Sequence, residues 1–167
     1  MERDSSSHAA RSEQDPSVTY GQGLPVVEQP LTVAFGVDNT FALPLAATIH
    51  SLLEGLPGAE QPHLYVVSQD ITHANKERLQ RVVEGRAQLH WLALPQRAVD
   101  PELLKTPAYL SPATFYKVFL PELLPPACRR VIYLDADVIL RGDLRALWGE
   151  DMQGNVVMAV RDTGVFN

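Results

Sequence analysis

Short apolar runs alternate with segments of helical periodicity from residue 31 onward, and this alternation leaves the chain very few possible folds. Residues 31–37, 63–67 and 89–94 are apolar runs of the length that buried strands have. Between them, apolar side chains recur at helical spacing over residues 45–56 and 71–83, where Thr72 is placed to cap the second helix. Alternating strands and helices predict βαβ units, and therefore an α/β fold with a parallel sheet.

The same pattern continues after a proline-rich connector over residues 95–112. A helix is expected over residues 113–120, and residues 131–134 form the predicted fourth strand. Residues 138–140 are interpreted as a short continuation of that strand, and residues 155–160 as a fifth strand. The first thirty residues lack any such periodicity and are rich in Ser, Gln, Gly and Pro. We therefore predict a disordered tail over residues 1–30 and one folded unit over residues 31–167.

The acidic balance of the chain limits its partners. Lys and Arg together number 14 and Asp and Glu number 20, which gives a net charge of −6 and argues against non-specific binding of nucleic acid or anionic membrane. A single cysteine, Cys128, excludes an intrachain disulfide and zinc sites of the two- or four-cysteine kind. No apolar run reaches the roughly 18 residues that a membrane span needs, and the N-terminus lacks the apolar stretch of a signal peptide. The expected location is the cytoplasm.

Polar side chains directly follow the predicted strands. The residues in question are Asp38 and Asn39, Ser68 to Asp70, Asp135 and Asp137, and Asp162. Right-handed crossovers place the carboxyl ends of all the strands on one edge of a parallel sheet, which is where ligands bind in such folds. Four of the five predicted strands thus bring a carboxylate to one edge, and we expect the functional site there.

The segment Tyr133-Leu134-Asp135-Ala136-Asp137 carries the most specific signal. In extended backbone, residues two apart point to the same side, so Asp135 and Asp137 can converge on one object. Two adjacent anions need a cation between them, and carboxylate oxygens suit Mg²⁺ or Mn²⁺ completed by phosphate oxygens and water. The pattern favours a divalent-metal site. The alternative is that Asp135 caps a turn and Asp137 is only solvated.

Several of these segments together resemble the family 8 retaining glycosyltransferases. They are the Asp-Asn-Thr exit of the first strand, the stretch Thr114-Phe115-Tyr116-Lys117 with residues 120–125 after it, the stretch Arg130 to Asp137, and the pair Leu147-Trp148. That family includes the bacterial lipopolysaccharide galactosyltransferases and glycogenin. The resemblance runs from about residue 31 to the end of the sequence. It implies a GT-A nucleotide-sugar-binding fold, with a Rossmann-like, mostly parallel sheet flanked by helices, of which this chain holds a C-terminally truncated, N-terminal part.

The resemblance also implies roles for individual residues. Asp135 and Asp137 would hold Mn²⁺ or Mg²⁺ against the diphosphate of a UDP-sugar, with Ala136 between them in the donor site. Asp38 and Asn39 would lie against the uridine. As the expected catalytic residues, Lys117 takes the place where the family usually has Arg, near the donor phosphate and sugar, and Asp162 would sit near the donor or acceptor sugar.

The implied activity is metal-dependent transfer of a hexose from a UDP-sugar to a saccharide or glycolipid acceptor, with retention, as in bacterial lipopolysaccharide biosynthesis. The implied partners are the donor and the acceptor. Neither nucleic acid nor a transmembrane segment is expected, and contact with a membrane surface would come from the missing C-terminal part. Family members commonly offer a carboxylate to the uracil where this chain has Val37. Their later histidine, a third metal ligand, has no counterpart here, so the truncated chain is expected to be inactive alone.

Two other functions fit parts of the pattern. In a haloacid-dehalogenase-like phosphatase, Asp135 would be the nucleophile and Asp137 the general acid beside Mg²⁺. That motif normally follows the first strand of its domain, whereas three strand–helix units precede it here. The second is a non-catalytic fragment that binds nucleotide-sugars without turnover. A dinucleotide-dependent oxidoreductase is disfavoured, because no G-x-G-x-x-G motif follows the first strand.

Overall fold

The computed structural model describes residues 29–56, 58, 61–95 and 111–160. Within them lies one four-stranded sheet in the order β3-β2-β1-β4, in which every neighbouring pair is parallel. The strands are β1 (Thr32–Gly36), β2 (His63–Val67), β3 (Gln88–Leu92) and β4 (Ile132–Tyr133). The predicted α/β class and parallel sheet are confirmed. The strand bounds agree with the first three apolar runs to within a few residues.

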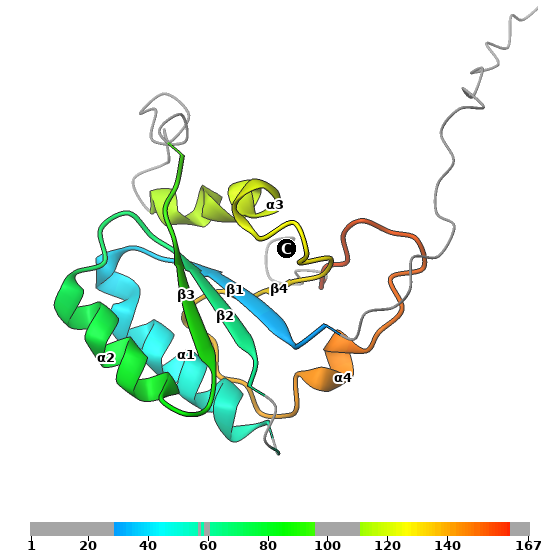
Figure 1. Ribbon diagram of the computed structural model, residues 1–167, viewed down its shortest axis with the longest axis horizontal. Coiled ribbons are helices and arrows are strands. Elements are labelled where there is room, and N and C mark those ends of the chain that lie inside the picture. Colours follow the sequence, from blue (N-terminus) through cyan, green and yellow to red (C-terminus); the bar gives the residue numbers. More distant parts are fainter. Residues whose placement is uncertain (1–28, 57, 59–60, 96–110, 161–167) are drawn as a thin grey trace, which may run out of the picture.

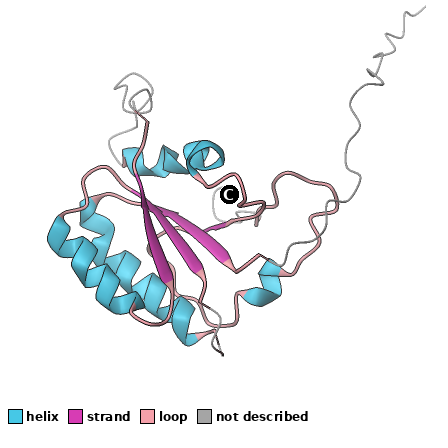
Figure 2. Ribbon diagram, in the orientation of Figure 1, coloured by secondary structure: helices cyan, strands magenta, loops and turns pink. Residues whose placement is uncertain are grey.

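Helices cover both faces of the sheet (Figure 1). On one face, α1 (Ala42–Glu54) and α2 (His73–Val83) lie side by side; on the other lie the 3₁₀ helix η3 (Pro112–Phe119) and the short α3 (Leu120–Leu123). Figure 2 shows the resulting order of helix, strand and helix layers. A single turn, η1 (Asn39–Phe41), joins β1 to α1, and α4 (Arg145–Trp148) follows β4. No helix among the described residues is long and apolar enough to cross a bilayer.

The core explains why the central strand is apolar throughout. Successive side chains of a strand point to opposite faces, and both faces of β1 are covered. Val33 and Phe35 pack with the apolar stripe of α1, whereas Ala34 packs with Tyr116 of η3 on the other side. All three β1 side chains are fully buried. The sheet is thus held between two apolar clusters, and the carboxyl ends of its parallel strands lie together at one edge.

Two predicted strands are absent from the described residues. Residues 138–140 are not a continuation of β4, because the chain turns at residues 136–137 and is then held by α1 instead of a neighbouring strand. Residues 155–160 do not form a fifth strand either, and Val156 and Val160 are 95% and 94% exposed. A strand needs a partner for its backbone hydrogen bonds and a face to bury, and among the described residues this segment has neither.

The helix predictions are confirmed. Thr72 caps α2 as expected, with its hydroxyl oxygen accepting a hydrogen bond from the Asn75 N–H at 3.4 Å. The helix expected over residues 113–120 is a 3₁₀ helix over residues 112–119. Of the predicted tail, residues 1–28 lie outside the described residues. Gln29 already belongs to the fold, since it donates to the carbonyl of Ala127 and accepts from the N–H of Arg129.

Candidate functional site

The carboxyl ends of three strands bring acidic residues to one edge of the sheet. Asp38 follows β1 by two residues, Asp70 follows β2 by three, and Asp135 follows β4 by two. The register places Gly36 opposite Val67 and Ala34 opposite Tyr133, so the three strands end at similar heights. The predicted gathering of carboxylates is therefore confirmed for these strands. Asp162 lies outside the described residues, and its role stays a prediction.

Asp38 is fully engaged in holding the loop that follows β1. One carboxylate oxygen accepts hydrogen bonds from the N–H groups of Thr40 and Phe41 at 3.0 and 3.3 Å, and the other accepts from the Ser111 hydroxyl at 2.6 Å. Burial alone would raise the pKa of Asp38, but the hydrogen bonds from Ser111 and Thr40 outweigh it and leave the pKa below its ordinary value. The residue joins the cap of η1 to the start of η3. Its predicted contact with uridine stays a prediction.

The contribution of Asp38 to the free energy of unfolding should be lost at acidic pH. Because its pKa is lower in the folded than in the unfolded chain, its contribution is complete above the unfolded value and is lost as the pH falls through the folded value. Replacing this capping group by Asp38→Ala should cost about 0.5–2 kcal/mol of unfolding free energy at pH 6. Urea unfolding should show a smaller difference between variant and wild type near pH 3. An equal difference at both pH values would contradict the assignment.

Asn39 forms a second bridge at this edge, between the loop after β1 and the start of α2. Its N–H donates to Asp70 at 3.0 Å, and its side-chain oxygen accepts from the Thr72 N–H at 3.0 Å and from the Asn75 amide at 2.9 Å. The side-chain oxygen is therefore occupied by the protein itself. The sequence placed Asn39 correctly at the edge, but a strand-exit asparagine does not reveal partners more than thirty residues away.

Lys117 lies on η3, on the face of the sheet opposite to α1 and α2, and its side chain reaches the end of β4. Its ammonium lies 5.1 Å from the centre of the Tyr133 ring, and Tyr133 is two residues before Asp135. Burial chiefly, and then the charge of Asp135, raise the pKa of the Tyr133 hydroxyl to about 12, with a hydrogen bond to the Gly36 backbone opposing the rise. Tyr133 therefore stays neutral at physiological pH. The structure thus places Lys117 against Tyr133, two residues before Asp135, and its predicted role at the donor site stays a prediction.

Gly36 permits the close contact between η3 and β1. A Cβ atom there would lie 3.0 Å from the Ala113 carbonyl oxygen, 3.1 Å from the Cβ of Tyr116 and 3.3 Å from the Tyr133 hydroxyl. Any side chain would press on the helix that carries Lys117. The apolar run over residues 31–37 predicted a strand here, but it did not reveal that η3 and Tyr133 leave no space for a side chain at residue 36.

Gly36→Val should therefore loosen η3. Overpacking of this kind costs typically about 1–3 kcal/mol of unfolding free energy, and the neighbouring backbone has little freedom to move. Chemical unfolding measures the loss, and hydrogen exchange of the η3 amides locates it. Gly149→Val, at a glycine whose nearest outside atom would be 3.4 Å from a Cβ, serves as the milder control. An equal loss in both variants would contradict the role of Gly36.

The loop that carries Asp135 and Asp137 presents both carboxylates to solvent. Ala136 between them is 5% exposed and packs in the core beside α1, so the two flanking side chains are exposed on the other side. The Thr48 hydroxyl of α1 lies 2.8 Å from the carbonyl oxygens of both Ala136 and Val138. Neither carboxylate accepts a hydrogen bond from another described residue, in contrast to Asp38. Sequence reasoning identified the pair but missed Thr48.

The donor set of this loop fits a hard divalent cation. Two carboxylates from a backbone held in place offer oxygen ligands of the type that Mg²⁺ and Mn²⁺ prefer. Within the described ranges, no cluster of three or more His, Cys, Asp or Glu side chains is able to hold a metal. A cation at this loop would thus draw on Asp135, Asp137 and additional oxygen ligands such as phosphate or water.

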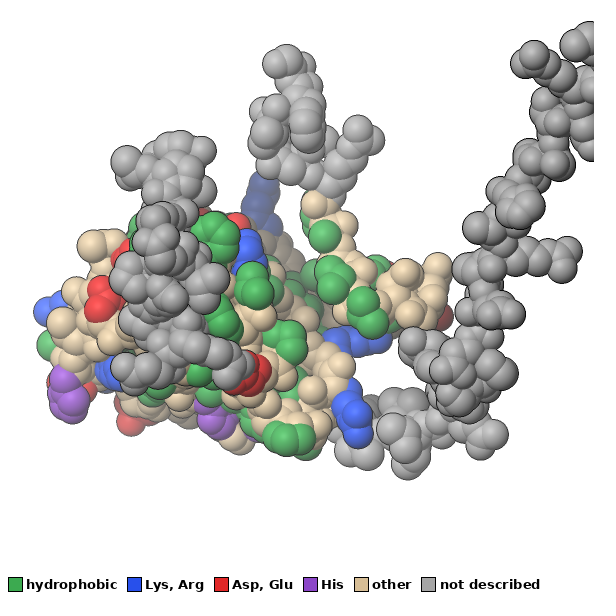
Figure 3. Space-filling model, turned by 90° about the horizontal axis from the view of Figure 1, so that it is seen from above, with side chains coloured by type: hydrophobic (Ala, Val, Ile, Leu, Met, Phe, Trp, Pro, Cys, Tyr) green, Lys and Arg blue, Asp and Glu red, His purple; other side chains and the backbone are tan. Residues whose placement is uncertain are grey.

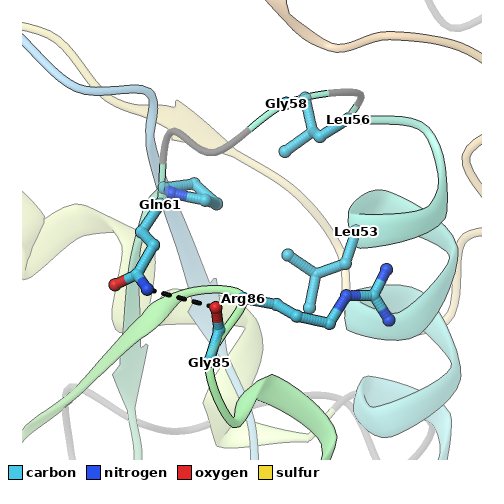
Figure 4. Close-up of a pocket in the computed structure, with 7 residues that line it drawn as sticks. Leu53, Leu56, Gly58, Gln61, Gly85 and Arg86 are labelled. Carbon is cyan, nitrogen blue, oxygen red and sulfur yellow. Dashed lines mark hydrogen bonds between the residues drawn. The ribbon is translucent and has the colours of Figure 1, made fainter.

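A small cavity lies at the opposite end of the sheet. It has a volume of about 130 Å³ and is formed where α1 ends, β2 begins and the turn after α2 passes (Figure 4). Its lining is Leu53, Leu56, Gly58, Gln61, Pro62, Gly85 and Arg86. Gln61 donates to the Gly85 carbonyl at 3.1 Å, and Arg86 forms an ion pair with Glu54 at 2.9 Å. Both polar side chains thus have partners within the protein, and the cavity lies far from Asp38, Asp70 and Asp135.

Among the described residues in the view of Figure 3, hydrophobic side chains are interspersed with charged and polar ones. Exposed apolar side chains near the carboxylate edge include Phe41 and Leu43 after β1 and Phe115 and Val118 on η3. The distinctive feature of this edge is therefore its charge: acidic residues from three strands, with Lys117 nearby.

Residues 32–167 match the family model of glycosyl transferase family 8. The chain belongs to this family. The resemblance noted in the sequence is thereby confirmed, and membership of family 8 favours a glycosyltransferase over a phosphatase of the haloacid-dehalogenase kind.

Relatives of the chain are longer than it is. It is 26% identical over 129 residues to General stress protein A of Bacillus subtilis (strain 168), a match that covers 76% of this chain and 44% of the relative. It is 28% identical over 134 residues to Glycosyltransferase GlyF of Streptococcus pneumoniae serotype 4, covering 78% and 31%. The family 8 chain described here thus spans less than half of the length of these relatives, in keeping with the prediction that it is one part of a larger unit.

Solved structures confirm the GT-A fold. The galactosyltransferase LgtC, in complex with donor and acceptor sugar analogs, superposes with a TM-score of 0.65 at 23% identity, covering 73% of this chain and 43% of LgtC. The bifunctional glycosyltransferase WbbM gives a TM-score of 0.59 at 22% identity, covering 79% and 23%. At this level of identity the likeness concerns the fold alone.

Proposed function

We propose that the full-length protein transfers a hexosyl group from a UDP-sugar to a saccharide or glycolipid acceptor, with retention of anomeric configuration. The observation that carries the proposal is the loop Asp135-Ala136-Asp137, which presents two exposed carboxylates at the ligand-binding edge of a family 8 fold. We further propose that this takes place in the cytoplasm, on acceptors such as those of bacterial lipopolysaccharide biosynthesis.

Asp135 and Asp137 are the residues proposed to hold Mn²⁺ or Mg²⁺. When bound, such an ion supplies Lewis-acid stabilisation of the negative charge on a departing diphosphate. The chain contributes the two anionic ligands and a backbone fixed by the burial of Ala136 and by the Thr48 hydroxyl. Fixed ligands need no reorganisation when the donor binds, which favours catalysis by preorganisation.

Lys117 is proposed to contact the donor phosphate and sugar. Its ammonium lies near the ring of Tyr133, two residues before Asp135, and from there its positive charge is proposed to attract phosphate oxygens. A lysine acts there as a compact point charge, without the two-pronged geometry of an arginine. Because Tyr133 stays neutral at physiological pH, it adds no further negative charge beside the diphosphate.

The remaining proposed contacts involve Asp38, Asn39 and Asp162. Asp38 and Asn39 form the loop after β1 and are proposed to border the uridine, with a backbone kept in place by the bonds to Ser111 and Asp70. Asp162 is proposed to lie near the transferred sugar or the acceptor. Residues 1–167 alone are proposed to bind the nucleotide weakly and to transfer no sugar, because they span less than half of the length of the family 8 relatives.

The test is a donor survey on the full-length protein. UDP release from a panel of UDP-hexoses is measured with saccharide acceptors, in Mn²⁺ and again in excess chelator, and an aryl phosphate is supplied in parallel. The proposal expects acceptor-stimulated UDP release from at least one donor that stops with chelator and returns with Mn²⁺. Undiminished release in chelator would contradict the metal dependence, and phosphate release from the aryl ester would favour the phosphatase function.

A further inference from the structure

Two hydroxyl side chains of α1 fasten the loop that carries Asp135 and Asp137. The Thr48 hydroxyl lies 2.8 Å from the carbonyl oxygens of Ala136 and of Val138, and shares its single proton between them. One turn further along the helix, the Ser51 hydroxyl accepts the Leu140 N–H at 3.0 Å and donates to the Thr48 carbonyl at 2.8 Å. Three backbone groups of the loop, from the alternate residues 136, 138 and 140, are thus bound to one helix.

Thr48 is a polar residue in a position that packing alone would give to an apolar one. It is fully buried and lies in the stripe of α1 formed by Leu45, Ile49 and Leu52. A buried hydroxyl is costly unless it is hydrogen-bonded, and here its bonds go only to the carboxylate loop. A valine would fill nearly the same volume and would remove those bonds. The Thr48 hydroxyl is therefore explained by its hydrogen bonds to the loop and not by packing.

The bound carbonyls are on both sides of Asp137. The Ala136 carbonyl is part of the peptide group directly before Asp137, and the Val138 carbonyl is part of the peptide group that follows Val138, while the buried Ala136 side chain anchors the loop from within. We propose that Thr48 and Ser51 are positioning residues, which set the separation and direction of Asp135 and Asp137 for a divalent cation. This inference rests on the proposed function, because it takes the two carboxylates as metal ligands.

A matched control distinguishes positioning from simple stabilisation. Thr32 is also a buried threonine, 5% exposed, and its hydroxyl donates to the Pro30 carbonyl at 2.9 Å. It lies at the start of β1, at the opposite end of the strand from the carboxylates. Thr32→Val and Thr48→Val each remove one buried hydroxyl that serves a backbone carbonyl. Only the second change concerns the metal loop.

The experiment measures Mn²⁺ binding to the full-length protein in the presence of UDP, by the loss of the free-ion signal in electron paramagnetic resonance. Thr48→Val should raise the Mn²⁺ dissociation constant by about 10- to 100-fold, the range typical of groups that orient metal ligands. Thr48→Ser, which keeps the hydroxyl, should bind within about threefold of the wild type, and Thr32→Val should bind as the wild type does. Ser51→Ala should show a smaller rise, because Ser51 holds one backbone group of the loop whereas Thr48 holds two.

Several results would overturn the proposal. Wild-type affinity in a folded Thr48→Val variant would do so, and so would an equal weakening in Thr32→Val, which indicates general loosening. If Thr48→Val does not fold, Ser51→Ala decides, and unchanged Mn²⁺ affinity in that variant overturns the role of the helix. Absence of Mn²⁺ binding in the wild type itself is a different outcome, since it overturns the proposed function on which this inference rests.

Discussion

Asp135→Asn and Asp137→Asn should each lower sugar transfer by the full-length protein by on the order of 10²-fold or more. Each change removes one anionic oxygen ligand from a loop that has two, while the amide keeps the size of the side chain. Among the described residues neither carboxylate has a hydrogen-bonding partner, so the loss is one of charge at the exposed edge rather than of a structural bond. Unfolding midpoints should stay close to that of the wild type.

Initial rates against Mn²⁺ concentration are the measurement for these two variants. Asp143→Asn is the matched control, because Asp143 is an acidic residue of the same segment that pairs with Arg145 at 2.6 Å, away from the loop. It should change the rate by no more than about twofold. Near-normal, metal-dependent transfer by both loop variants would remove the metal assignment.

Lys117→Met should also have a large effect, on the order of 10²-fold in turnover, because it removes a positive charge beside the place proposed for the donor phosphates. The methionine keeps most of the apolar stem that lies near Tyr133. Lys117→Arg should retain much of the activity, since the charge remains and the family usually has arginine at this place.

The control for Lys117 is Lys76→Met. Lys76 lies over the Trp91 ring at 5.0 Å, almost the same cation–ring distance as the 5.1 Å between Lys117 and Tyr133, but on α2 and β3. Both variants lose one such contact, worth about 0.5–1 kcal/mol at exposed sites. Turnover measured in parallel should fall only in Lys117→Met. An equal fall in both would show that the ring contact, and not the position of the charge, explains the result.

The strands that could be predicted are those that the apolar side chains of their own residues identify. Residues 31–37, 63–67 and 89–94 are apolar because helices cover the sheet, and they became β1, β2 and β3. Residues 155–160 have the same composition, but a strand also needs a neighbour to pair with, which an apolar run cannot reveal. Likewise, β4 ends early because α1 holds the chain that follows it.

In the candidate site, too, only the features encoded by neighbouring residues could be predicted. The carboxylates of Asp135 and Asp137 could be located from their spacing after an apolar run, since that is a local property. The groups that hold the site in place could not. Ser111 bonds to Asp38 across 73 residues of sequence, and Thr48 bonds to Ala136 across 88. The one local signal was a threonine in the apolar stripe of a helix, whose partner only the fold identifies.

The central claim is that Asp135 and Asp137 bind a divalent metal together with the diphosphate of a UDP-sugar. Crystals of the full-length protein grown with UDP and Mn²⁺, and measured at the manganese absorption edge, test it most directly. The account predicts an anomalous peak within about 2.0–2.3 Å of an oxygen of each carboxylate and in contact with the diphosphate. Bound UDP with the anomalous peak at other residues, or with no peak at this loop, would contradict it.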